Sequence, residues 1–278
     1  MSTYKELLKT AYEFLKSNGV ADADVDSWYL LTHVFGLSRV EFFIHGQEIC
    51  PKDKAKEYMK LIEKRANHIP LQYLLGTQEF MGLEFEVNED VLIPRQETEL
   101  LVEEVLKLSN NKSVLDLCTG SGCIIISLAK LGCLKRAVGV DISEKALQVA
   151  DRNRKVHKAE VEFIKSDLFD KLEGKYDIII SNPPYIKSLD LASLMPEVKD
   201  WEPVLALDGG PDGLRFYKKI ISDLYRFLNP GGHVFFEIGY DQGQAVKSML
   251  QSAGLTDVDI KKDYSGHDRI VYGRLVLN

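Results

Sequence analysis

The sequence predicts an α/β protein in which a small all-helical domain and a connecting β-hairpin precede a seven-stranded, mostly parallel sheet. Apolar residues recur at helical spacing through the first 72 residues, and strand-like and helical runs alternate after residue 96. Such alternation is typical of a parallel sheet with helices on both faces. We therefore divide the chain into residues 1–72, 73–95 and 96–278.

Four helices are expected in residues 1–72. The first ends at Asn18-Gly19, and Asp24 or Asp26 can cap the second. Ser38 caps a short third helix, and Pro51-Lys52-Asp53 opens the fourth. The charged residues here are solvated faces, with no cluster of catalytic type.

The remaining elements follow from apolar runs and turn residues. Phe80, Leu83 and Phe85 lie around Met81-Gly82, which predicts the hairpin. A helix should begin at Glu97 and end near Leu108, and residues 230–232 (Pro-Gly-Gly) predict a turn before a strand. Strands are expected at residues 113–117, 136–141, 160–164, 176–181, 232–238, 256–262 and 269–276.

Composition limits the class of protein. The net charge of −7 argues against a general nucleic-acid binder, which is more often basic. The N-terminus lacks the form of a signal peptide, and no apolar run approaches the ~18 residues of a membrane span. We expect a cytoplasmic monomer with no membrane contact, no metal site and free thiols at Cys50, Cys118, Cys123 and Cys133.

A glycine-rich turn follows the first strand of the sheet. Residues 113–117 read as a strand, residues 124–130 as a helix, and Cys118-Thr119-Gly120-Ser121-Gly122 lies between them. Such a turn lets the backbone approach a ligand closely. Ile125 stands where the NAD fingerprint G-x-G-x-x-G has its third glycine, so this loop fits that fingerprint poorly.

Two carboxylates end the next two strands. Asp141 follows Val140, and Asp167 follows Ser166. A carboxylate at the position of Asp141 can accept hydrogen bonds from both hydroxyls of a ribose. Ligands of open α/β sheets bind at the carboxyl ends of the strands, near the switch in strand order. The order of these groups predicts a ligand site there.

The fourth strand ends in Asn182-Pro183-Pro184-Tyr185. The prolines have fixed φ and no N–H, and Asn182 is held extended by the proline that follows it. The amide of Asn182, nearby carbonyls and the ring of Tyr185 form a rigid rim of acceptors beside an aromatic face. Such a rim suits a planar –NH2 group, with the Asn182 oxygen and the Pro183 carbonyl accepting its two N–H hydrogens.

At these motifs the chain resembles the HemK/PrmC family of protein-(glutamine-N5) methyltransferases, which modify peptide chain release factors. The resemblance covers nearly the whole chain. The segments that carry it are residues 92–99 (with Pro94-Arg95 and Thr98-Glu99), 116–122, 182–185, 202–207 and 266–274.

The resemblance implies a Rossmann-like class I methyltransferase that uses S-adenosyl-L-methionine and releases S-adenosyl-L-homocysteine. It implies that residues 118–122 hold the methionine end of the cofactor, Asp141 the ribose, and Asp167 with Leu168 the adenine. It implies that Asn182 also lies by the cofactor's methyl group and that Asn182, Pro183 and Tyr185 are catalytic. The substrate glutamine is held by Asn182, Pro183, Pro184 and Tyr185. Relatives often carry glycine at Cys118 and an aromatic residue at Leu168. Glu97, Glu99 and Trp201 are equally compatible with ligand contact and with structural roles.

The implied substrate is the glutamine of the Gly-Gly-Gln motif in class I release factors, which act in translation termination. No direct nucleic-acid contact is expected, and residues 1–72 should recognise the protein substrate. Two alternatives stay open: a DNA or RNA amino-group methyltransferase, and a methyltransferase for a ribosomal-protein glutamine. The preferred release factor, the oligomeric state and the domain orientation are not determined by the sequence.

Overall fold

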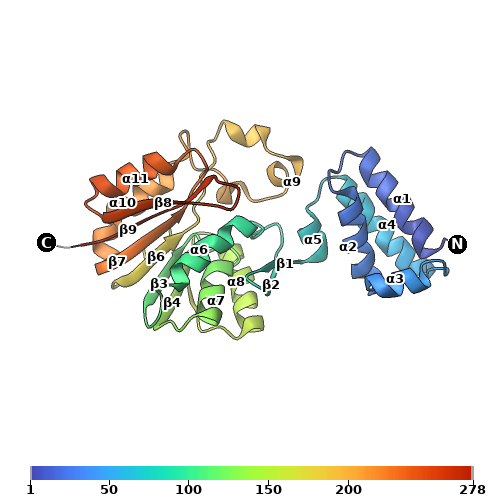
Figure 1. Ribbon diagram of the computed structural model, residues 1–278, viewed down its shortest axis with the longest axis horizontal. Helices are drawn as coiled ribbons and strands as arrows, with labels where there is room; N and C mark the ends of the chain where they lie inside the picture. Colours follow the sequence, from blue (N-terminus) through green and yellow to red (C-terminus); the bar gives the residue numbers. More distant parts are fainter. Residues whose placement is uncertain (1, 277–278) are drawn as a thin grey trace. The chain divides into compact units, whose positions relative to one another are not determined.

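The computed structural model describes residues 2–276, which form two compact units (Figure 1). The helical unit contains the chain up to Thr77 together with Met195–Trp201. The catalytic unit contains Gln78–Leu194 and the chain from Glu202 onward.

The helical unit packs its helices around one apolar core, which includes Leu15, Leu30 and Tyr58. A capping box of Thr3 and Glu6 starts the first helix, and Ser38 with Glu41 starts the third, as predicted for Ser38. The helices are α1 (Tyr4–Ser17), α2 (Ala23–Phe35), α3 (Arg39–His45), α4 (Lys52–Ala66), α5 (Leu71–Leu75) and α9 (Pro196–Lys199).

The prediction that Asp24 or Asp26 caps the second helix is wrong. Asp22 is the residue before α2, and both predicted caps lie in the first turn. Asp26 is instead buried, and its Oδ2 accepts a hydrogen bond of 2.6 Å from Arg65 Nε. Arg65 Nη2 also donates to Glu197 Oε1 at 2.9 Å, which ties α9 to the helical unit.

The catalytic unit begins with the predicted hairpin and continues as a seven-stranded sheet. The order in the sheet is β5-β4-β3-β6-β7-β9-β8, and β9 runs antiparallel to both of its neighbours. The strands are β1 (Thr77–Phe80), β2 (Leu83–Glu86), β3 (Ser113–Leu117), β4 (Arg136–Asp141), β5 (Glu162–Lys165), β6 (Tyr176–Ser181), β7 (Leu228–Glu237), β8 (Thr256–Lys262) and β9 (Asp268–Arg274).

Three strands have other boundaries than predicted, and β9, at Asp268–Arg274, ends two residues before the predicted position. β5 begins two residues later than expected, and β7 begins at Leu228, so residues 230–232 lie inside a strand. The register between β6 and β7 shifts there, because Tyr176 pairs with Leu228 whereas Ile178 pairs with His233. The glycines expected to form a turn therefore form an irregularity within the strand.

Helices cover both faces of the sheet (Figure 1). Side chains alternate between the faces, so Val114 and Ile178 pack against α6 (Gln96–Leu106) and α7 (Cys123–Leu131). Leu115 and Ile179 pack on the other face, against α10 (Arg215–Phe227) and α11 (Gly243–Ser252). The further helices of this unit are α8 (Glu144–His157) and the short turns η1 (Asp190–Ser193) and η2 (Val204–Ala206).

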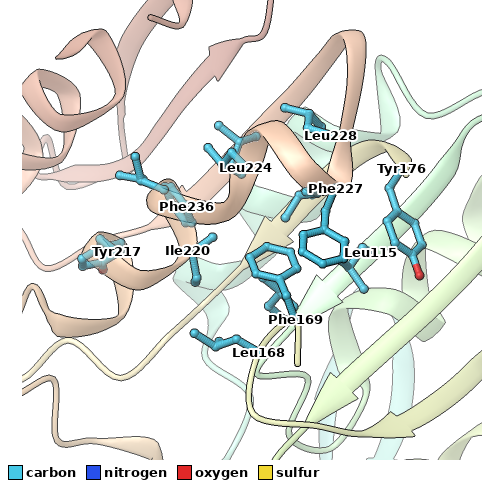
Figure 2. Packing of buried hydrophobic residues seen from close by; sticks show 14 of the residues in the cluster. Leu115, Leu168, Phe169, Tyr176, Tyr217, Ile220, Leu224, Phe227, Leu228 and Phe236 are labelled. Carbon is cyan, nitrogen blue, oxygen red and sulfur yellow. The ribbon is translucent and has the colours of Figure 1, made fainter. Parts of the chain in front are cut away.

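The core on the α10 and α11 face includes one candidate ligand-binding residue, Leu168. Figure 2 shows Leu168 beside Phe169, whose ring stacks on that of Phe227 at 4.5 Å between centroids. Leu168 and Phe169 are both buried. This packing fixes the loop after β5.

Across residues 2–276, no helix has both the length and the apolar character needed to cross a membrane.

Candidate active site

The candidate site lies where the strand order reverses. From β3 the chain adds β4 and β5 on one side, whereas β6 and β7 lie on the other. Leu117 and Ser181 end β3 and β6 side by side, and Ser181 Oγ donates to the Leu117 carbonyl at 2.7 Å. The residues that follow, Cys118 and Asn182, are therefore brought together at the switch point where such sheets bind ligands.

The turn after β3 is shaped by its own backbone. Cys118, Gly120 and Gly122 all have positive φ, which favours glycine and is strained at Cys118. The Gly122 N–H donates to the Thr119 carbonyl at 2.8 Å and closes the turn before α7. A side chain at Gly122 would meet Ile126, Phe163 and Ala150, so this glycine allows close packing.

Asp141 holds this turn to the end of β4. Its Oδ2 accepts from the Gly120 N–H and its Oδ1 from the Ser143 N–H, each at 2.9 Å. Burial raises the pKa of Asp141 above its ordinary value, whereas these backbone donors lower it. Each carboxylate oxygen keeps a second lone pair, so Asp141 can still accept hydrogen bonds from a ligand diol.

Asp116 is a buried carboxyl under the same turn. Its Oδ2 accepts a 2.6 Å hydrogen bond from the Thr119 hydroxyl, and its Oδ1 has no hydrogen-bond partner among the described residues. Burial, with Asp141 nearby, raises its pKa to about 7. This shift favours the neutral form of Asp116, so Asp141 is the carboxylate beside the turn that favours a ligand carrying positive charge.

Apolar and basic groups complete the opposite wall. Leu168 follows Asp167 and faces the same cavity as Phe216, the second residue of α10. Lys219 Nζ lies 3.8 Å from Asp167 Oδ2. Leu168 stands where relatives often carry an aromatic residue. Phe216 supplies a flat aromatic surface in the same cavity, so this wall suits a planar ring.

Two parts of the chain that the sequence did not single out support the segment Asn182–Tyr185. They are Gln242, the residue before α11, and the glycine-rich loop of residues 208–213. Gln242 Nε2 donates to the Tyr185 carbonyl at 2.9 Å. A methyl group at Gly209 would lie only 2.7 Å from Tyr185 Cα, so that loop needs glycine to approach. The Gly209 N–H also donates to the Ile186 carbonyl at 2.8 Å. The clustered glycines of residues 208–213 were the available signal.

A cavity of about 240 Å³ joins these groups. It is bounded by candidate residues from four strand ends: Cys118, Gly120, Asp141, Asp167, Leu168, Asn182 and Pro184. Residues that the sequence did not single out also line it, among them Asp90, Ile142, Arg215, Phe216 and Lys219. Thr119, Ser121, Gly122, Pro183 and Tyr185 are not among the lining residues.

Glu99, one of the weaker candidates, and Glu202, from a segment that carries the resemblance, make structural contacts. Glu99 Oε1 accepts a hydrogen bond of 2.6 Å from the Met81 N–H, which attaches α6 to the hairpin. Glu202 is buried, and its Oε1 accepts from Arg95 Nη2 at 2.5 Å. Pro203, Leu205 and Ala206, which follow Glu202, line the cavity. Trp201 belongs to the helical unit.

Two protein-family models match this chain, and a relative of known name is similar to it over nearly its whole length. Residues 6–76 match the model "PrmC N-terminal domain", and residues 96–197 match "Methyltransferase small domain". The chain is 40% identical to a release factor glutamine methyltransferase of Geobacter sulfurreducens, over 98% of this chain and 97% of the relative.

Two solved structures share the fold. A methyltransferase from Pyrococcus furiosus is 20% identical with a TM-score of 0.56, covering 70% of this chain and 90% of that one. A T. thermophilus 16S rRNA methyltransferase, in complex with AdoMet and guanosine, is 18% identical with a TM-score of 0.50. The match covers 72% of this chain and 49% of that one.

Proposed function

Because the chain belongs to the family of release factor glutamine methyltransferases, we propose that it transfers a methyl group to the side-chain amide nitrogen of a release-factor glutamine. The acceptor is the glutamine of the Gly-Gly-Gln motif in class I release factors. The observation that carries this proposal is the meeting of Asn182 and Pro184 with Cys118, Gly120 and Asp141 around one cavity.

The methyl donor is S-adenosyl-L-methionine, and S-adenosyl-L-homocysteine is released. When bound, the donor supplies an electrophilic sulfonium methyl group. Asp141 accepts hydrogen bonds from its ribose, and the turn of residues 118–122 holds its methionine end through Cys118 and Gly120, which line the cavity. Leu168 and Phe216 enclose the adenine. The negative charge of Asp90, Asp141 and Asp167, which line the cavity, favours the positive sulfonium.

The segment Asn182–Tyr185 holds the acceptor amide. A glutamine nitrogen is a poor nucleophile because its lone pair is delocalised into the carbonyl. Asn182 Oδ1 and the Pro183 carbonyl accept the two N–H hydrogens, which directs the nitrogen toward the methyl group and stabilises positive charge developing on it. Tyr185 packs against the amide plane. Orientation of this kind can contribute about 7–11 kcal/mol.

The product nitrogen must lose one proton after methyl transfer. Burial raises the pKa of Tyr185 to about 12, so its hydroxyl stays protonated at neutral pH and is no base. The proton leaves to solvent after transfer.

The helical unit recognises the body of the release factor. It carries an exposed apolar cluster on and beside α3, consisting of Val40, Phe43, Ile44 and Ile49. The side chain of Phe43 is 90% exposed. Apolar clusters at the surface often mark protein-binding sites.

The decisive experiment is mass spectrometry of a release factor incubated with enzyme and S-adenosylmethionine. With the wild type we expect one added methyl group, on the glutamine. In Asn182→Ala we expect kcat for this reaction to fall by about 100-fold or more. Near-normal kcat in Asn182→Ala would reject the proposed role of this segment. Tritium from labelled cofactor that enters RNA or DNA instead would reject the substrate.

A second experiment tests recognition by the helical unit. Phe43→Ser should raise KM for the release factor and leave cofactor affinity unchanged. Val156→Ser, which alters an exposed valine of the catalytic unit, is the matched control. An unchanged KM in Phe43→Ser would reject the assignment of this cluster.

A further inference from the structure

Glu237 is a buried carboxyl next to the proposed active site that has no part in the mechanism above. It ends β7, the neighbour of β6, and the preceding residue, Phe236, pairs with Ser181. Glu237 follows Phe236 and Asn182 follows Ser181, so Glu237 and Asn182 lie at the same level on neighbouring strands. The side chain does not line the cavity, and its residue is only 2% exposed.

The carboxyl of Glu237 faces two polar side chains from other elements. Asn182 Nδ2 donates to Thr98 Oγ1 at 3.4 Å. The hydroxyl of Thr98 and the amide of Asn182 lie close enough to the carboxyl of Glu237 to lower its pKa. The second carboxyl oxygen, Oε2, has no hydrogen-bond partner among residues 2–276. Asn182 is thus hydrogen-bonded to Thr98, and both side chains lie beside the buried carboxyl of Glu237.

We propose that Glu237, with Thr98, is a positioning residue that fixes the side-chain amide of Asn182 so that Nδ2 faces the protein interior and Oδ1 faces the substrate. This inference rests on the proposed function. The two ends of a primary amide have nearly the same shape but opposite hydrogen-bonding character. A flipped Asn182 would present its own –NH2 to the –NH2 of the substrate, and neither group could accept from the other.

An ionised carboxylate settles this choice because it can only accept hydrogen bonds. Nδ2 must therefore face Glu237 and Thr98, and Oδ1 must face away from them. An anion at Nδ2 also polarises the amide and increases negative charge on Oδ1. Oδ1 then becomes a stronger acceptor for a substrate nitrogen on which positive charge develops.

Because Glu237 can be protonated, the orientation of Asn182 depends on pH. Burial is the main cause that raises its pKa, to about 7, and Arg269 opposes that shift while Glu97 adds to it. A protonated carboxyl can donate a hydrogen bond, so the orientation of Asn182 is then no longer enforced. The charged and titratable groups that face Glu237 are Glu97 on α6, Cys123 on α7, Tyr185 after β6, Tyr217 on α10 and Arg269 on β9.

The test compares Glu237→Gln and Thr98→Val with the wild type, with methylated release factor as the product. Glutamine keeps the size of Glu237 but can donate as well as accept, so it no longer selects one orientation of Asn182. We expect kcat to fall about 10- to 100-fold in Glu237→Gln, with the cofactor Kd from calorimetry changed less than twofold. The rise of kcat with pH near 7 should disappear as well.

Thr98→Val tests the same positioning of Asn182 but keeps the carboxyl of Glu237. It is also the variant to measure if Glu237→Gln does not fold. It should lower kcat with little effect on KM. Glu173→Gln, at an exposed position, is the control for loss of a carboxylate. A kcat within threefold of wild type in Thr98→Val, or an unchanged pH profile in folded Glu237→Gln, would overturn the inference. If the wild type does not methylate the glutamine at all, the proposed function fails instead.

Discussion

Arg95 Nη2 donates to Glu202 Oε1 across 2.5 Å, which joins the residue before α6 to the residue that follows the Met195–Trp201 segment. The Glu202 side chain is 2% exposed and that of Arg95 is 35% exposed. Both residues belong to segments that carry the family resemblance. The pair thus has a structural role beneath the cavity wall formed by Pro203, Leu205 and Ala206.

We expect Arg95→Ala to destabilise the catalytic unit by roughly 3 kcal/mol, because it leaves a buried carboxylate without its cation. Glu202→Gln should cost less, since it removes the buried charge together with the pair. Thermal unfolding of the two variants and of the double variant would measure the coupling. Equal stability of Arg95→Ala and wild type would contradict this role.

Gly209→Ala should impair catalysis without loss of the fold. The added methyl group would lie 2.7 Å from Tyr185 Cα and 2.8 Å from the Pro184 carbonyl oxygen, so the substrate-holding segment must shift. A displacement of about 1 Å can cost about 100-fold in rate. Gly273→Ala is the control, because its methyl group meets only side-chain atoms, the nearest 3.1 Å away on Val258. Equal kcat in the two variants would reject the constraint.

Cys118→Gly should be tolerated and should stabilise the protein. Cys118 has φ of +61°, a conformation that costs a non-glycine residue about 1–2 kcal/mol. Loss of the packed thiol offsets part of the gain, so we expect about 1 kcal/mol or less by chemical denaturation. Cys133→Gly, at a position without positive φ, should gain nothing. Cofactor affinity should be retained, because glycine only widens the cavity.

The free energy of unfolding should fall as pH rises from about 4 to about 7. Burial raises the pKa of Asp116 from 3.8 to about 7, so the folded protein keeps a proton that the unfolded chain releases in this window. The cost at higher pH is at most about 4 kcal/mol. Asp116→Asn should reduce the slope, with the raised pKa of Glu237 supplying a remainder of the same sign, and should be the more stable protein at pH 8. A slope identical to wild type, measured by denaturation across this range, would contradict the assigned pKa.

Removal of Arg65 should destabilise the helical unit and release Met195–Trp201 from it. Arg65→Ala would leave Asp26 buried without its cation and would remove the hydrogen bond to Glu197. We expect faster amide hydrogen exchange in α9 and a lower melting temperature. Arg39→Ala, which alters an exposed arginine of the same unit, is the control. Unchanged exchange in α9 would show that other contacts hold this segment.

The sequence by itself determined the elements and the order of the site along the chain. The apolar patterns of period two and period 3.6 are local in the sequence. A strand that leads to Asp141 or to Asn182 can therefore be recognised without knowledge of the strands beside it. Since parallel strands end at the same edge, the sequence also predicted that these residues lie near one another. The tertiary structure placed Cys118, Asp141, Leu168 and Asn182 around one cavity.

Only the tertiary structure decided which side chains meet across that edge. Arg95 and Glu202 are 107 residues apart, and Thr98 and Asn182 are 84 apart. Glu237 meets Asn182 because β7 lies beside β6, a pairing that depends on strand order and register. Local patterns carry no information about such contacts, because side chains far apart in the chain are brought together only by packing of the whole unit.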